Sequence, residues 1–382
     1  MKRKQLAVLF VCNLIPYIVG NAIMTFLPVY AAKLGGTEAS AGIALSISFI
    51  GLTLGTLASG WLSDRFQRRK LLYILCGLAC IPAIFLVGQA HNIVLMTIFI
   101  SIAWFFSGMA NALINILTGL FVHPDERGSV FGVIGTSLAL GQVIGGVVSG
   151  FIVDHGGFAA LCTFGALVWI APIFMGMLLE DKQVVAVESR VRRPSVPLSG
   201  AIWILIGANV LASVSNFSAG LLRPIIMDHL GFNGGAIASV TMVSGLVMLP
   251  LPFVVGWLSD RIGRRQMIIW SYLLSSVGAL VLMSSLSLWQ FWLSTSLLAI
   301  ASGIIGVGLA YITDIVPSEA VGGALARYSA TPPMAGVLGY AGTGLIVQVI
   351  GLSATFVTGA ALPLFAVLMM LTIRRSMQIA RA

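Results

Sequence analysis

Long apolar stretches alternate with short polar segments along the whole chain. A stretch of about 20 apolar residues forms a helix long enough to cross a hydrocarbon layer about 30 Å thick. The pattern therefore predicts an all-α integral membrane protein with twelve transmembrane helices, at residues 5–31, 40–62, 70–89, 92–122, 128–153, 157–179, 199–229, 234–258, 266–287, 289–316, 320–349 and 351–373.

The two halves of the chain repeat one another. Residues 60–65 read GWLSDR, and residues 256–261, 196 positions later, read GWLSDR again. Asn13 and Asn209 share the same offset. A repeat of this length indicates two homologous units. We expect a six-helix N-terminal bundle, a cytoplasmic linker and a six-helix C-terminal bundle, at residues 1–180, 181–198 and 199–382. Because six is even, the two bundles point the same way across the membrane, as parallel repeats.

The charges support this topology. Of the 382 residues, 58% are hydrophobic and only 9% are charged, with a net charge of +9. Eighteen of the 21 lysines and arginines fall in six segments that alternate with nearly uncharged loops. This is the positive-inside pattern, which predicts a multi-pass protein of the inner, cytoplasmic membrane with both termini in the cytoplasm. The apolar stretch that follows the basic N-terminus is too long for a signal-peptide core, so we expect it to be retained. The placement of the charges argues against nucleic-acid binding.

Residues with metal-binding or catalytic chemistry are scarce. All four cysteines, Cys12, Cys76, Cys80 and Cys162, lie inside apolar stretches. In that position they are typical of packing residues and not of a disulfide or metal framework. The sequence contains no nucleophile-base pair, nucleotide-binding loop or metal cluster, so we expect neither a cofactor nor an enzyme.

The loop between the second and third predicted spans carries a motif, Gly-x-x-x-Asp-Arg-x-Gly-Arg-Arg, which recurs between the eighth and ninth. This motif in a chain of six plus six spans resembles the major facilitator superfamily of secondary transporters. The second copy is complete, whereas Gln67 stands in the first where the family has glycine. The resemblance implies two six-helix bundles that work by alternating access.

The small and acidic residues of the motif suggest a latch. Gly60 and Gly256 would let a neighbouring helix sit close, and Asp64 and Asp260 can face the positive end of a helix dipole. By the resemblance, these contacts hold the cytoplasmic side closed in the outward-facing state. Their expected partners are the starts of the eleventh and fifth spans, near Ala320 and Gly128.

The motif also carries a set of arginines. We expect them to hold the loops through lipid phosphates and through carboxylates, with Asp314 as one candidate. The alternative is that they act only as signals of topology. The arginines are Arg65, Arg68, Arg69, Arg261, Arg264 and Arg265.

Two features bear on proton coupling. The fifth span reads Gly-Gln-Val-Ile-Gly-Gly from Gly141, similar to the antiporter signature of drug and proton exchangers, but Gln142 stands where that signature has proline. A glycine-rich packing helix gives the same string without antiport. Trp104 occupies the approximate place of an arginine that the family associates with proton coupling, which makes proton exchange less certain.

Polar residues form stripes on three predicted spans. Buried polar groups in lipid are costly unless they face a cavity or a partner. Spacings of three, four and seven residues place each stripe on one helix face. The stripes lie on spans one, four and seven, and these spans line the central pathway in the family together with span ten. Interhelical hydrogen bonds are the alternative for any single residue. The candidate cavity residues are Asn13, Tyr17, Asn21, Trp104, Asn111, Asn115, Gln142, Asn209, Asn216 and Tyr311.

The charges inside the spans restrict the class of solute that the protein can bind. Since no carboxylate falls at the centre of a predicted span, neutral or amphipathic monocationic solutes fit better than dications. Arg223 and Arg327 are the candidate buried cations. We expect Arg223 to pair with Asp228 at the outer mouth, and Arg327 to pair with Asp314 or Asp260 at the inner one. Snorkelling of either arginine to the interface is the alternative.

Together these features predict an exporter of a small organic solute, drug-like or a sugar. The best coupling acids, Asp154, Asp228 and Asp314, lie near span ends, so proton antiport and facilitated transport both stay open. The alternative function is uptake of a neutral nutrient, and a membrane receptor or scaffold is more remote. The expected partners are the solute, protons and membrane lipids, with the protein as a monomer.

Overall fold

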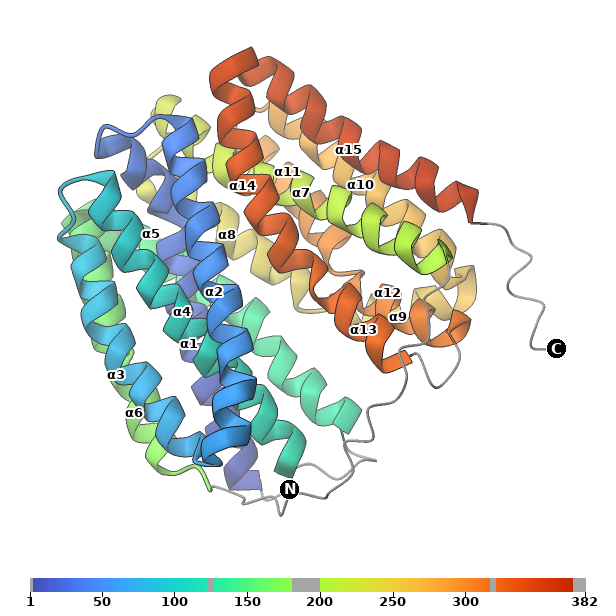
Figure 1. The fold of residues 1–382 in the computed structure, drawn as a ribbon. Coiled ribbons are helices and arrows are strands. Elements are labelled where there is room, and N and C mark those ends of the chain that lie inside the picture. Colours follow the sequence, from blue (N-terminus) through green and yellow to red (C-terminus); the bar gives the residue numbers. More distant parts are fainter. Residues whose placement is uncertain (1–2, 122–126, 181–199, 317–320, 374–382) are drawn as a thin grey trace. The chain divides into compact units, whose positions relative to one another are not determined.

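The computed structural model describes residues 3–121, 127–180, 200–316 and 321–373, and within these ranges the chain is helical without a strand (Figure 1). The helices are α1 (Arg3–Lys33), α2 (Glu38–Phe66), α3 (Arg69–Gly88), α4 (Ile93–Phe121), α5 (Arg127–Val168), α6 (Ile170–Met177), α7 (Gly200–His229), α8 (Gly234–Met248), α9 (Leu251–Ile262), α10 (Arg264–Met283), α11 (Leu288–Ser302), α12 (Ile305–Ile315), α13 (Val321–Ser329), α14 (Thr331–Ile350) and α15 (Leu352–Thr372).

The described helices account for the twelve predicted spans. Ten helical segments are long and apolar enough to cross a membrane, and α8 with α9 forms an eleventh that is bent by 48°. The longest segment, Gly132–Met177, has 46 residues and at 1.5 Å per residue would extend for about 69 Å, roughly twice what a membrane needs. It is interrupted at Gly157, where φ is 72° and ψ is −174°, so it contains the fifth and sixth spans. The all-helical twelve-span fold is therefore confirmed.

Prolines mark two of the interruptions. Pro250 lies between α8 and α9, where its missing N–H prevents a continuous helix. The break before α14 is followed by Pro332 and Pro333 in the first turn of that helix, where a missing N–H costs nothing.

The chain divides into two compact units. Unit 1 contains Met1–Val187 and Pro224–Leu246, and unit 2 contains Glu188–Arg223 and Val247–Ala382. The predicted linker, residues 181–198, lies outside the described residues.

Glycines bring the helices of unit 1 into backbone contact. A Cβ added at Gly51 of α2 would lie 2.7 Å from the carbonyl oxygen of Ser101 in α4, and one added at Gly108 would lie 2.5 Å from that of Leu52. A Cβ at Gly145 of α5 would lie 2.7 Å from the carbonyl oxygen of Ile18 in α1. Close packing of small residues, which is a main source of helix association in lipid, therefore accounts for these glycines.

Unit 2 has one continuous apolar core. It is built from buried residues of α7, α9, α10, α12, α13 and α15, including Leu205, Ile268, Ile312, Ala324 and Met370. Many large apolar side chains of the protein point outwards instead. Such a surface fits lipid and not water. Its members include Trp61, Phe151, Trp203, Phe253, Leu286 and Val349.

All four cysteines are buried and unbonded to one another, as the sequence predicted. Cys80 Sγ donates to the carbonyl oxygen of Ala103 at 3.6 Å, and the carbonyl oxygen of Cys12 accepts from the hydroxyl of Tyr73 at 2.9 Å. Cys80 and Cys12 therefore lie where α3 packs against α4 and α1.

Candidate functional site

A chain of amide side chains connects three helices of unit 1. Asn115 Nδ2 donates to Asn111 Oδ1 at 3.0 Å, and Asn111 Nδ2 donates to Asn13 Oδ1 at 3.3 Å. Asn13 Nδ2 then donates to Ser137 Oγ at 2.8 Å. The chain runs from the buried Asn13 on α1, through α4, to the exposed Asn115, with Ser137 on α5. The predicted stripes of spans one and four thus face each other, and they are bonded.

The other candidates on α1 and α4 lie close to this amide chain. The side chain of Tyr17 is a neighbour of Asn111. A Cβ added at Gly20 would lie 3.4 Å from the ring of the buried Trp104, so that indole packs against α1. Asn21 Nδ2 donates to the carbonyl oxygen of Tyr17 at 2.7 Å, within its own helix. The interhelical hydrogen-bond interpretation therefore holds for Asn13 and Asn111 but not for Asn21.

The stripe on α7 makes similar contacts inside unit 2. Asn209 Nδ2 donates to Thr331 Oγ1 of α14. Asn216 Nδ2 donates to the carbonyl oxygen of Leu298 in α11 at 3.3 Å. Tyr311 is buried in the core of the unit. These residues tie helices together.

Gln142 differs from the other candidates. Its Oε1 is enclosed and has no hydrogen-bond partner among the described residues. A Cβ added at Gly245 of α8 would lie 2.8 Å from Gln142 Cβ, so the side chain starts from a close contact between α5 and α8 within unit 1. The glycines beside it also serve packing, since a Cβ at Gly146 would lie 2.6 Å from Met242 N.

The first basic turn ends α2 with a left-handed residue. Gln67 has φ 50° and ψ 17°, and its N–H donates to the carbonyl oxygen of Ser63 at 3.1 Å. In the second turn Gly263 has φ 98°. Gln67 therefore adopts the positive φ that a glycine adopts in the second copy. The buried Arg69 donates from Nε to Ser63 Oγ at 2.7 Å, and Arg65 lies over the ring of Trp61, 5.4 Å from its centroid.

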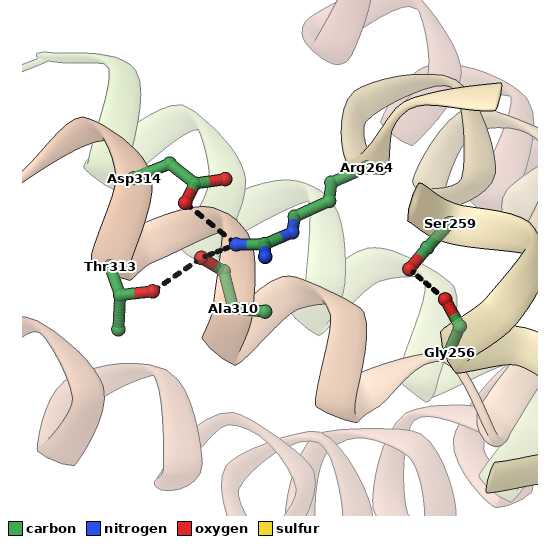
Figure 2. A network of polar contacts seen from close by, with 6 residues as sticks. All are labelled: Gly256, Ser259, Arg264, Ala310, Thr313 and Asp314. Carbon is green, nitrogen blue, oxygen red and sulfur yellow. Dashed lines mark hydrogen bonds and ion pairs between the residues drawn. The ribbon is translucent and has the colours of Figure 1, made fainter. Parts of the chain in front are cut away.

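The second basic turn holds α12 through an ion pair. Figure 2 shows Arg264 reaching from the start of α10 to α12, where Nη1 lies 2.7 Å from Asp314 Oδ1. The same nitrogen donates to the carbonyl oxygen of Ala310 at 2.7 Å. The expected contact between a loop arginine and Asp314 is confirmed. Because both side chains are partly exposed, such a pair contributes about 1 kcal/mol or less.

Two further arginines complete this turn. Arg265 Nη2 donates to the carbonyl oxygen of Met370 in α15 at 2.9 Å. Arg261 stacks over Trp257, with 4.0 Å from Cζ to the ring centroid. The second basic turn is thus bound to α12 and α15. In the first basic turn, the side chain of Arg68 is exposed.

The described residues do not test the expected helix contact at the motif glycines. A Cβ added at Gly60 or Gly256 would meet nothing within 4 Å among the described residues. Asp64 and Asp260 are both exposed. Their expected partner region near Ala320 lies outside the described residues, and the surroundings of Gly128 are not described. The latch itself stays a prediction.

The expected ion pairs of the two in-span arginines are wrong. Asp228 Oδ1 lies 3.8 Å from Lys33 Nζ instead. Arg223 and Asp228 are five residues apart on α7, and only residues three or four apart face each other on a helix. Arg327 Nη1 donates to the carbonyl oxygen of Gly323 at 3.2 Å. Arg264, not Arg327, binds Asp314 among the described residues.

Asp154 has a partner that sequence reasoning missed. Its Oδ1 accepts from the N–H of Gly234 at 2.6 Å, and Oδ2 accepts from that of Gly235 at 2.8 Å. Both N–H groups belong to the first turn of α8, within unit 1. The carboxylate therefore caps the positive end of that helix. A Cβ at Gly234 would lie 2.7 Å from Asp154 Oδ1, so a residue with a side chain would crowd the carboxylate. The Gly-Gly pair at the start of the eighth span was therefore the sequence feature that could have indicated this contact.

Comparison with known proteins gives a consistent assignment. A sequence model of the Major Facilitator Superfamily matches residues 9–209 and, a second time, residues 204–380. The multidrug resistance protein MdtG of Salmonella typhimurium is 28% identical over 306 residues, 74% of this chain and 73% of that protein. MdtG of Klebsiella pneumoniae is 26% identical over 276 residues, 67% of this chain and 65% of the relative, slightly less than two thirds of its length.

Solved structures agree on the fold. A peptide transporter POT in complex with sulfate has a TM-score of 0.79 at 14% identity, covering 98% of this chain and 95% of that one. A D-xylose-proton symporter has a TM-score of 0.76 at 15% identity and covers 98% of both chains. Since the family match extends over both halves of the sequence, the chain belongs to the major facilitator superfamily.

Proposed function

We propose that this protein is a secondary transporter that exports a small organic solute across the cytoplasmic membrane by alternating access. The observation that carries the proposal is the separate family match of each half, because many transporters that work by alternating access are built from two repeated halves. The direction is supported by the relatives named as multidrug resistance proteins.

The polar groups of unit 1 support a solute pathway beside α1, α4 and α5. The amide chain ends at the exposed Asn115, which leaves hydrogen-bonding capacity at that end. Gln142 Oε1 is a further acceptor without a partner among the described residues. An enclosed acceptor in an apolar protein is costly unless something bonds to it, so a solute donor is a suitable partner.

Proton antiport is the coupling we favour, and the acids available for it are all engaged. Asp154 binds the start of α8, Asp228 lies near Lys33, and Asp314 binds Arg264. Protonation of any of them would weaken a contact that holds two helices together. A proton taken up at one of these sites would thus change the packing of the protein, which is what coupling needs.

The positive-inside distribution supports an inner-membrane location with both termini in the cytoplasm. Reporter fusions at each end test this orientation. A cytoplasmic reporter should be active at both termini and a periplasmic reporter at neither. One active periplasmic fusion would contradict the topology. Size measurement of the purified protein in nanodiscs tests the expected monomer.

The decisive experiment uses inside-out and right-side-out membrane vesicles with a fluorescent amphiphile. For a proton-driven exporter, inside-out vesicles should accumulate the compound when acidified inside, and a protonophore should abolish accumulation. Flux that persists without a gradient would indicate facilitated transport. Accumulation only in right-side-out vesicles would support the alternative, uptake of a nutrient, and vesicles lacking the protein serve as the control.

A further inference from the structure

Arg223 is a cation in the last two turns of a transmembrane helix. It lies six residues before the end of α7 and about 35 Å from the first residue of that helix at 1.5 Å per residue. Its Nε is enclosed and has no hydrogen-bond partner among the described residues. The side chain as a whole is only partly buried. Of its three nitrogen atoms, only Nε is both enclosed and without a hydrogen-bond partner among the described residues. The terminal nitrogens are therefore not sealed from a ligand.

Snorkelling does not explain this position. A snorkelling arginine buries its aliphatic stem and keeps its charged head in water. Here part of the head is itself enclosed by protein. Removing a charged group from water costs free energy, so a charged side chain that is partly enclosed within a span needs a compensating interaction. Such a side chain is therefore a candidate functional site.

No described carboxylate neutralises Arg223. Tyr340 of α14 is a titratable neighbour of Arg223. The three acids near span ends are each committed elsewhere, Asp154 to α8, Asp228 to Lys33 and Asp314 to Arg264. Within unit 2, the described residues thus provide a guanidinium that no carboxylate of that unit pairs with.

Aromatic and hydroxyl groups join α7 to α14 in the part of the helix that precedes Arg223. Tyr340 packs edge-on against Phe217 of α7, with ring centroids 5.3 Å apart. A Cβ added at Gly220 would lie 3.7 Å from the Tyr340 hydroxyl. Because Pro224 has no N–H, the Gly220 carbonyl lacks its helical donor. One turn away, the hydroxyls of Ser218 and Thr343 join α7 to α14.

We propose that Arg223 and Tyr340 form a binding subsite for the carboxylate of an amphipathic organic anion. The planar guanidinium fork matches the two oxygens of a carboxylate. The Tyr340 hydroxyl adds a hydrogen-bonding group, and Phe217 provides an aromatic wall for an apolar body. The inference rests on the proposed transport function and names its substrate class. It replaces the expectation of a neutral or monocationic solute.

The test compares three probes of the same shape: 1-naphthylacetate, 1-naphthylacetamide and 1-naphthylethylamine. Their dissociation constants are measured on the purified full chain in nanodiscs of zwitterionic lipid. We expect the carboxylate to bind about tenfold more tightly than the amide and the amine. Arg223→Gln should abolish this difference. Arg223→Lys should keep part of it, since lysine is charged but has no fork, and Tyr340→Phe should reduce it about threefold.

Lys70→Gln is the matched control, because it also removes one positive charge. Lys70 Nζ bonds to the carbonyl oxygen of Met177 in unit 1, so its loss should leave the carboxylate preference unchanged. If Arg223→Gln does not fold, Arg223→Lys and Tyr340→Phe decide the question. Equal binding of carboxylate and amide by the wild type, or an equal loss in Lys70→Gln, overturns the subsite.

Transport of the uncharged amide separates this inference from the proposed function. Suppose that wild-type and Arg223→Gln vesicles export the amide equally, and that neither exports the carboxylate faster than the amide. That result would support export and contradict the anion subsite. Protein that binds the carboxylate through Arg223 but moves no probe in vesicles would retain the subsite and contradict export.

Discussion

The positive φ angle of Gln67 lowers the stability of the folded protein. It occupies the left-handed region at φ 50°, where a residue with a Cβ loses about 1–2 kcal/mol relative to glycine. The equivalent turn in the other half uses Gly263. Both basic turns therefore contain a residue of positive φ, but ψ is 17° at Gln67 and 137° at Gly263, so the two backbone conformations differ.

We predict that Gln67→Gly stabilises the protein by about 0.5–1 kcal/mol, because relief of the strain exceeds the added flexibility of the unfolded chain. Thermal unfolding in detergent or nanodiscs measures it. The reverse change, Gly263→Gln, should lower the unfolding midpoint. An unchanged midpoint in both variants would show that neither turn limits stability.

Asn111 occupies the middle of the amide chain, and Asn115 occupies its exposed end. Asn111→Ala removes the donor to Asn13 Oδ1 and leaves that buried oxygen with one partner fewer. We expect a loss of about 1–2 kcal/mol in stability and weaker solute binding. Asn115→Ala should weaken binding alone. Equal stability losses in the two variants would mean that the exposed end is as structural as the centre.

At the scale of helices, packing through glycine can be tested with a matched pair. In Gly51→Ala the new methyl would meet the carbonyl oxygen of Ser101 at 2.7 Å, which should separate α2 from α4 and cost about 1–3 kcal/mol. In Gly60→Ala, on the same helix, the methyl meets open space and should add up to about 1 kcal/mol through helix propensity. Thermal unfolding compares them.

The cap on α8 predicts a role for Asp154 in stability. Asp154→Ala removes the acceptor for two N–H groups at the start of that helix and should cost about 1 kcal/mol. Asp154→Asn keeps one oxygen but loses the charge, so its loss should be smaller. Differential scanning of the two variants tests this order. An unaffected midpoint in Asp154→Ala would show that water caps the helix equally well.

The spans were predictable for a physical reason, because hydrophobicity over about 20 residues sets them. The break at Pro250 was not predicted, since residues 234–258 were expected to form one span, and it follows from local backbone chemistry. Partners between helices were not predictable in the same way. Asp228 was assigned to Arg223 because they are close in sequence, yet its observed neighbour, Lys33, lies at the end of α1. Which helix faces an acid depends on three-dimensional packing.

The residues of the candidate cavity were predictable only in part, because their partners also depend on three-dimensional packing. Helical phase correctly placed Asn13 and Asn111 on facing sides of α1 and α4. It could not distinguish them from Asn21, whose amide is satisfied within its own helix. The enclosed Nε of Arg223 also required the structure, since sequence position alone fits a snorkelling side chain equally well.

At the scale of the whole molecule, the two basic turns should act together. By family resemblance, Asp64→Asn and Asp260→Asn each weaken an inner latch and should reduce transport several-fold while leaving membrane insertion intact. Initial rates in inside-out vesicles, normalised to protein content, measure this. Full activity in both variants would refute the latch, and Glu38→Gln, at the start of α2, serves as the control.

The repeat has diverged in how each turn is anchored. Arg69 binds a serine of its own turn in unit 1, whereas its counterpart Arg265 binds the carbonyl oxygen of Met370 on another helix of unit 2. The two halves have therefore kept the motif but not its contacts, so equal effects of the two aspartate variants are not required.

The four buried thiols make the protein suitable for site-directed spectroscopy. Maleimide reagents need an accessible thiolate, which enclosed cysteines do not present. A pair of new cysteines introduced at exposed positions of the two units would carry spin labels or fluorophores without prior removal of the native ones. The distance distributions obtained with and without solute would then report the conformational cycle in an otherwise unaltered chain.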